Sequence, residues 1–388
     1  MNKAKIFIEM EKRNSTTENF QYCFSKIMRA CGFEARFKFI LEVTQKDLNW
    51  CNVYIAVRPN TPSSLAIAQK ITASGRLYIV YFDDDLLNRK GALGWRIKCG
   101  IKCLKLADIV LGANELLCKE YAQYTKTQQY YVLNTPVEEK EYSKPHRIGD
   151  RIQFVYAAGR DHGIFFEKLL KPILREFLEK YHNRVHFTFI GVEPDIKTVG
   201  YADCFSFIPL MPLDRYTHFM RSQQFNVGLA PLDQHSFSQR KYFNKYIEYT
   251  KAGIAGIYSD NLPYTLIVQD AVNGYLVDNT SEAWLAAITY IVDHPYEIQG
   301  LIINAQKILR QKFNLNNIAS NFLNSIPEMT KAQRYTFIRW SFNLIQWMTF
   351  SVLDKTKKIE QQIRCGGMKS ATKLVSNHIK DKTGGGGK

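Results

Sequence analysis

Short apolar strands alternate with helices along most of this chain, and the alternation limits the folds that it can adopt. In the first part of the sequence, each apolar run typical of a buried strand is followed by a stretch with helical periodicity. Strands are expected at 5–9, 35–40, 53–57, 77–82, 109–111 and 130–133. Because buried strands connected by helices pair in parallel, the pattern predicts a doubly wound α/β sheet.

The alternation stops at residues 134–136, and the polar stretch 138–151 follows. This stretch is either a long surface loop or a linker, and a linker is favoured because the alternation begins again with a strand predicted at 152–158. The sequence then divides into Rossmann-like domains at 1–137 and 152–330. Such domains bind ligands beyond the carboxyl ends of their strands, so the two are expected to face a common cleft.

The composition is that of a globular protein, with 46% hydrophobic and 23% charged residues in a chain of 388. The formal net charge of +16 favours an anionic partner, such as a nucleotide, an acidic membrane or a nucleic acid. The extension 331–388 has 12 lysines and arginines against 3 aspartates and glutamates. The eight cysteines form no CxxC pair, and the first apolar run is too short for a signal peptide, so we expect reduced thiols in a cytoplasmic protein.

The segment 241–253, KYFNKYIEYTKAG, contains the clearest candidate binding residues. On a helix that ends at Gly253, spacings of four and three place Lys241, Lys245 and Glu248 on one face. Two ammonium groups and a carboxylate suit a ligand with phosphates at one end and sugar hydroxyls at the other. The alternative is a solvated helix face with an ordinary Lys–Glu pair.

The order of these motifs resembles that of GT-B glycosyltransferases of retaining family four (glycosyltransferases group 1), over roughly residues 1–325. The strand FVYAA ends in Gly-Arg-Asp-His at 159–162, and VGLAPL at 227–232 resembles a later strand of the family. The helix before Gly253 and the strand NGYLV at 273–277 follow in the family's order. The resemblance implies two Rossmann-like domains and a nucleotide-sugar donor.

The resemblance also implies a role for each matching residue. Arg160 and Lys245 would hold the donor diphosphate with help from Lys241, because charge develops on the leaving phosphate. Glu248 would accept hydrogen bonds from ribose or sugar hydroxyls, and Gly159 would let the backbone approach the ligand. Arg160, Lys245 and Glu248 are the implied catalytic residues. The implied donor-binding residues are Gly159, Arg160, His162, Lys241, Lys245, Glu248 and Tyr249.

Two positions depart from the family's pattern. Phe165 stands where relatives often have a lysine, and Arg240 stands where many have the first of two glutamates. His162 has a second interpretation, since a lone histidine is often only structural. These departures leave room for a protein that has lost catalysis.

Acceptor contacts are expected from the first domain. The sequence RLYIVYFDDDLL resembles a segment in one branch of the family, which makes Asp83, Asp84 and Asp85 candidates. The aspartates are alternatively a metal-binding DxD element of a single-domain GT-A transferase, or helix-capping and solvated residues. Arg58 directly follows a strand, and it would either hold an acceptor phosphate or be an ordinary loop arginine.

The stretch 335–353 is rich in aromatic residues and has one narrow polar stripe when drawn as a helix. Lysines and arginines continue to Lys382, a pattern typical of a helix lying on an anionic membrane surface. We therefore expect membrane contact through 335–382. The alternative is a helix packed on the first domain.

The resemblance to this family implies a retaining, metal-independent hexosyltransferase that needs no cofactor. It would move a sugar from a nucleotide-sugar to a surface glycan or lipid-linked acceptor in polysaccharide biosynthesis. Its expected location is cytoplasmic, peripheral at the inner face of the membrane. The alternative function is non-catalytic binding of anionic membrane or nucleic acid, but no nucleic-acid-binding module is recognisable, so no nucleic-acid partner is expected.

Overall fold

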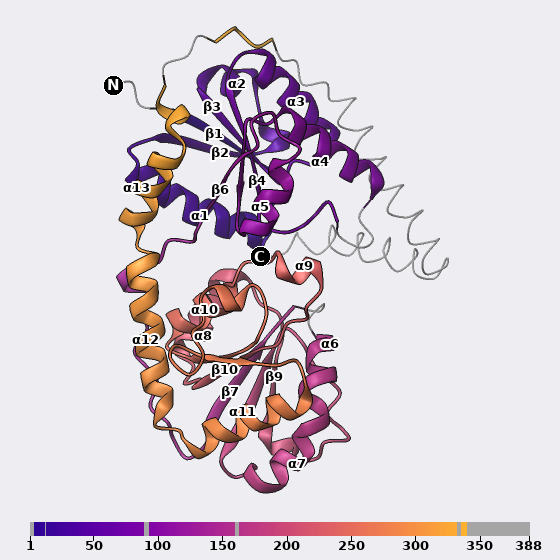
Figure 1. Ribbon diagram of the computed structural model, residues 1–388, viewed down its shortest axis with the longest axis vertical. Coiled ribbons are helices and arrows are strands. Elements are labelled where there is room, and N and C mark those ends of the chain that lie inside the picture. The colour runs from indigo at the N-terminus through magenta and orange to yellow at the C-terminus, as the bar shows by residue number, and fades with distance from the viewer. Residues whose placement is uncertain (1–3, 12, 89–92, 160–162, 332–334, 340–388) are drawn as a thin grey trace, which may run out of the picture.

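The computed structural model describes residues 4–11, 13–88, 93–159, 163–331 and 335–339. Within these ranges the chain forms two domains, each built on a six-stranded parallel sheet with helices packed around it (Figure 1). The prediction of an α/β chain with two Rossmann-like domains is confirmed.

The first domain contains a sheet with the strand order β2-β1-β3-β4-β5-β6. Alternate residues of its central strands enter two separate cores on opposite faces, so every residue of β3 and β4 is buried. The strands are β1 (Lys5–Met10), β2 (Glu34–Phe39), β3 (Val53–Val57), β4 (Leu77–Phe82), β5 (Ile109–Gly112) and β6 (Gln129–Val132). The helices are α1 (Ser15–Ala30), α2 (Gln45–Trp50), α3 (Pro62–Ala73), α4 (Gly94–Leu106) and α5 (Glu115–Ala122).

The second domain repeats this plan with the strand order β12-β11-β10-β7-β8-β9. Its strands are β7 (Ile152–Ala157), β8 (Val185–Ile190), β9 (Phe205–Ile208), β10 (Val227–Ala230), β11 (Ala255–Ser259) and β12 (Tyr275–Val277). Its helices are α6 (Gly163–Phe165), α7 (Lys171–Tyr181), α8 (Leu213–Ser222), α9 (Ser236–Gln239), α10 (Asn244–Ala252), α11 (Ser281–Asp293) and α12 (Glu297–Lys312). Parallel pairing throughout directs the carboxyl ends of all strands to one edge of the sheet.

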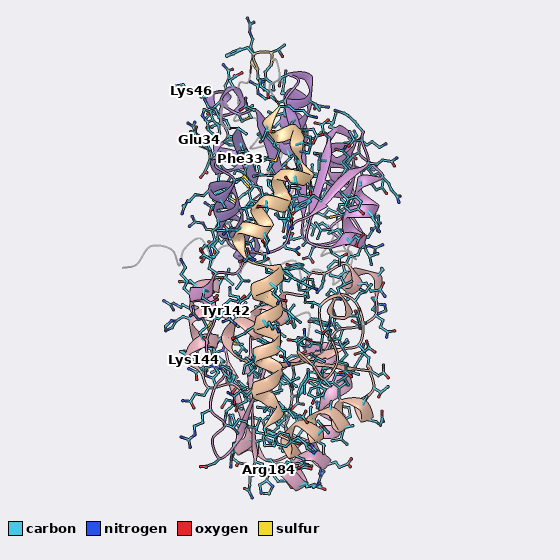
Figure 2. All side chains as sticks on the ribbon, turned by 60° about the vertical axis from the view of Figure 1, so that its left-hand side comes forward. Phe33, Glu34, Lys46, Tyr142, Lys144 and Arg184 are labelled. Atoms are coloured by element: carbon cyan, nitrogen blue, oxygen red, sulfur yellow. The ribbon has the colours of Figure 1, made fainter. Side chains whose placement is uncertain are left out.

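The chain returns to the first domain after α12. Helix α13 (Leu315–Ser325) packs on α1, with the rings of Phe24 and Phe322 edge to face at 5.8 Å between centroids. Figure 1 shows α12 and α13 end to end along the left-hand side of the molecule, and Figure 2 shows the same side facing the viewer. The domain boundary predicted at residue 330 is therefore too late, because α13 buries its apolar face on the first domain.

The start of the basic extension also packs on the first domain. The backbone N–H of Thr336 donates to the carbonyl of Ser74, and Asn49 exchanges two hydrogen bonds of 2.8 Å with the backbone of Ile338, which is buried. The remainder of the predicted membrane segment, 340–388, lies outside the described residues. No helix in the described ranges is long and apolar enough to cross a bilayer.

Candidate functional site

Helix α10 is fixed in place by a buried aromatic face and a glycine at its end. Tyr246 and Tyr249 are fully buried beneath it. The helix ends at Gly253, whose φ is +72°, and a Cβ there would lie 2.5 Å from the carbonyl oxygen of Lys144. Only glycine fits this left-handed, crowded position, so the helix ends where the sequence predicts.

Lys245 and Glu248 form an ion pair on the outer side of α10. The Lys245 Nζ lies 2.6 Å from Glu248 Oε2, and the Tyr216 hydroxyl of α8 donates to the same oxygen at 2.9 Å. The two charged side chains remain 27% and 34% exposed, so a ligand can reach them. Burial lowers the pKa of Lys245, but the Glu248 carboxylate more than offsets this and raises it above its usual value. Lys245 therefore stays charged. Tyr216 is a residue of this site that nothing in the sequence pattern predicted.

A pocket of about 410 Å³ lies between the two domains and contains these groups. The second domain contributes Lys241, Lys245 and Glu248, while the first contributes Asp83 and Asp84. Lys241 lies in the turn before α10 rather than on the helix, yet it faces the same pocket. Much of the remaining wall is apolar and comes from α1 and nearby strand ends, including Phe20, Phe24, Ile27, Tyr81 and Leu133.

The predicted phosphate-side turn is described only at its first residue. Gly159 follows β7, and no described atom lies within 4 Å of the place that a Cβ would occupy. No described residue therefore prevents a ligand from approaching this backbone. Arg160 and His162 lie outside the described residues, so their roles stay predictions.

Arg58 is paired with two of the predicted acceptor-side aspartates. Its Nε lies 2.5 Å from Asp83 Oδ1, and its Nη2 lies 3.6 Å from Asp84 Oδ2. Arg58 is not among the residues that line the pocket, so its expected contact with an acceptor phosphate stays a prediction. The Asp83 and Asp84 carboxylates thus face the Arg58 guanidinium. The alternative of a single-domain GT-A architecture is wrong, because the chain forms two domains.

Asp85 does not belong to the acceptor-side group. Its side chain is fully buried, accepts a hydrogen bond of 2.9 Å from the Tyr121 hydroxyl, and pairs with Arg240 of the second domain at 3.3 Å. Buried behind these partners, it has no path to an acceptor in the pocket. Sequence reasoning therefore misassigned Asp85 and recognised Arg240 only as a missing glutamate.

Tyr249 is also corrected, from a donor-binding to a structural residue. Its ring lies over Gly228 of β10 so closely that a Cβ on that glycine would be 2.4 Å from the ring. Its hydroxyl donates to the carbonyl of Leu229 at 3.0 Å. Tyr249 thus holds α10 on the sheet and does not line the pocket.

Comparison with known proteins gives a match in fold. No protein-family model matches the chain, and no curated protein matches it. The structure of Anabaena HepE in complex with UDP and glucose is similar over 84% of this chain and 100% of that chain, with a TM-score of 0.61 and 12% identity.

Two further structures are similar over 84% of this chain and 99% of their own. They are sucrose-phosphate synthase from Thermosynechococcus elongatus, with a TM-score of 0.60 and 11% identity, and the lipopolysaccharide outer core galactosyltransferase WaaB, with 0.55 and 13%. At this level of identity the likeness shows the fold. The chain therefore has the GT-B fold, two Rossmann-like domains that face an interdomain pocket.

Proposed function

We propose that this protein is a glycosyltransferase that moves a hexose from a nucleotide-sugar to a hydroxyl of an acceptor. The observation that carries the proposal is the Lys245–Glu248–Tyr216 group, which faces the interdomain pocket opposite Asp83 and Asp84. Cations and a carboxylate on one wall match the two ends of a nucleotide-sugar. HepE is also known in complex with UDP-glucose, which supports such a donor here.

In the proposed reaction, the bond between the sugar and the diphosphate breaks, and the nucleoside diphosphate leaves with the electron pair. Lys245 and Lys241, with Arg160, stabilise the charge that develops on the leaving phosphate without a metal ion. The acceptor oxygen forms the new glycosidic bond, and its proton passes to the leaving diphosphate oxygen. Glu248 accepts from donor hydroxyls, and the resemblance to retaining family four supports retention of configuration at the sugar.

The acceptor is proposed to enter from the first domain. The apolar wall formed by Phe20, Phe24, Ile27 and Tyr81 suits a lipid-linked acceptor or the apolar face of a glycan. The basic extension supports a peripheral location at the inner face of an anionic membrane, where such acceptors are accessible. We therefore place the protein in the synthesis of surface polysaccharides or glycolipids.

The test is release of nucleoside diphosphate from a panel of nucleotide-sugars, with membrane lipid extract as the acceptor source. One donor is expected to turn over, and Lys245→Ala and Glu248→Ala should each lower kcat/KM at least about tenfold. Lys119→Ala is the matched control, because Lys119 forms a helical ion pair of 2.8 Å with Glu115 away from the pocket. Wild-type activity in both pocket variants would overturn the proposal.

A further inference from the structure

The turn from Gln239 to Tyr242, just before α10, is bound to the opposite domain. The Arg240 guanidinium lies 3.3 Å from Asp85 Oδ2 and 2.5 Å from Glu120 Oε2, both in the first domain. The Asn114 side-chain amide donates to the backbone carbonyls of Gln239 and Lys241, at 3.1 and 3.0 Å. These contacts hold the turn on both sides of Arg240.

Asp85 makes this contact unusual, because its carboxylate is fully buried and the cation beside it belongs to the other domain. Among the described residues of its own domain, its hydrogen-bond partners are the neutral Tyr121 hydroxyl and Asn88. A buried carboxylate that loses its cation is costly. Separation of the domains at this point would leave the Asp85 carboxylate without its cation. The ion pair between Arg240 and Asp85 therefore favours the arrangement in which the two domains are in contact.

The position of this contact allows it to affect how far the pocket between the domains opens. The chain crosses between the domains at the linker and at the connection from α12 to α13. Figure 1 shows α9, which leads into Arg240, on the opposite side of the molecule from α12 and α13. A hinge at the crossings would open the domains most widely on the side of Arg240.

We propose that Arg240 is an interdomain clasp, a positioning residue that holds the cleft closed and fixes the start of α10 against the first domain. Lys245 follows Arg240 by only five positions, so the same short turn positions both the Arg240 guanidinium and the Lys245 ammonium group. The effect on substrate binding rests on the proposed function, whereas the effect on domain separation does not.

The test is small-angle X-ray scattering of the full chain. Arg240→Ala should raise the radius of gyration, and Arg240→Lys should restore part of the closure. Arg175→Ala is the control, because Arg175 pairs with Glu179 within α7 and its loss should leave the radius unchanged. Arg240→Ala in an Asp85→Asn, Glu120→Gln background should open the molecule little further, since the background already lacks both ion pairs of Arg240.

An unchanged radius of gyration in Arg240→Ala would overturn the clasp. If that variant does not fold, the Asp85→Asn, Glu120→Gln double variant is measured instead, and an unchanged radius there would also overturn the clasp, because both ion pairs of Arg240 are removed. A kinetic comparison separates the clasp from the proposed function. Arg240→Ala should raise KM for the nucleotide-sugar about tenfold while changing kcat less than about threefold. If wild-type protein transfers no sugar, the proposed function fails and the scattering result still decides the clasp.

Discussion

At the scale of single residues, the charge of Lys245 depends on Glu248. Burial lowers the pKa of this lysine, and the neighbouring carboxylate raises it above the usual value. The ion pair therefore keeps a cation available in a partly desolvated pocket. Tyr216 donates to the same carboxylate and holds its orientation.

This dependence predicts a shifted pH profile in Glu248→Gln. Without the carboxylate, the lowering effect of burial on Lys245 loses its largest opposing cause, so the pKa of Lys245 should fall. Nucleotide affinity should then be lost at a lower pH than in wild-type protein, because the deprotonated amine no longer attracts phosphate. Isothermal titration with UDP across alkaline pH measures this. Identical pH profiles for the two proteins would show that Lys245 does not hold the phosphate.

Residue spacing predicted part of the site and missed the rest for a physical reason. The pairing of Lys245 with Glu248 follows from helical geometry, which is local, whereas Lys241 reaches the same pocket from the turn before α10. The environments of Asp85 and Tyr249 depend on which element packs over them, and no local pattern records this. Arg240 was noticed in the sequence, but its partners lie in another domain.

At the scale of elements, the linker is bound to both domains through Glu141, in the short 3-10 turn Glu139–Glu141. This carboxylate lies 3.1 Å from Lys26 of α1 and 3.4 Å from Lys251 of α10. Burial raises the pKa of Glu141, but the two lysines together lower it below its ordinary value. Tyr142, the next linker residue, lies beside α12 in Figure 2 and packs against Arg310. The linker is therefore a packed element.

Glu141→Gln should destabilise the protein by about 2 kcal/mol at pH 7, because Lys251 loses its ion-pair partner and Lys26 keeps only Glu138 among the described acidic residues. Since the folded-state pKa is depressed, the carboxylate stabilises above its unfolded pKa of about 4.5, and this contribution is lost as pH falls through the folded value. The difference in the free energy of unfolding between Glu141→Gln and wild type should therefore shrink below the folded-state pKa of Glu141.

Denaturant unfolding at several pH values measures the Glu141 effect. Glu139→Gln is the control in the same turn, because Glu139 is 74% exposed and solvent screens its pair with Arg310, so its loss should matter less. Equal losses of unfolding free energy in Glu141→Gln and Glu139→Gln would contradict a special role for Glu141.

Elements with long apolar patterns were predicted well, and short or mixed ones were not. The strand β3 is a continuous apolar run and lies where the sequence places it. The short helix α2 and the strand β9 were missed, since QKDLNW and FSFI give too few residues for a period to show. The return of α13 to the first domain is a tertiary contact, so no boundary signal marks it.

At the scale of the whole molecule, the extension begins from a fixed point on the first domain. Ile338 is buried there, and Arg76 donates to the carbonyl of Thr336 at 2.9 Å. A chain truncated after residue 339 therefore keeps these contacts and should fold like the full chain. This makes the truncation a clean test of the membrane proposal.

The full chain should bind vesicles that contain anionic lipid, and the chain ending at residue 339 should lose most of this binding. Binding should weaken as salt increases, because basic residues contribute about 1 kcal/mol each near such a surface. Co-sedimentation with vesicles of phosphatidylglycerol and phosphatidylcholine, against phosphatidylcholine alone, measures the effect. Equal binding by both chains would show that the vesicles bind to the two domains and not to the extension.

The central claim is that the interdomain pocket binds a nucleotide-sugar through Lys245. The most direct measurement is the thermal stability of the full chain with UDP, GDP, ADP or CMP, each in EDTA and in manganese, beside Lys245→Ala and the control Lys119→Ala. A ligand at about a hundred times its Kd adds roughly 2.7 kcal/mol of stability. We predict that one nucleoside diphosphate raises Tm in EDTA, and that Lys245→Ala alone loses this rise. No shift with any nucleotide would contradict the claim, and a shift only with manganese would contradict metal independence.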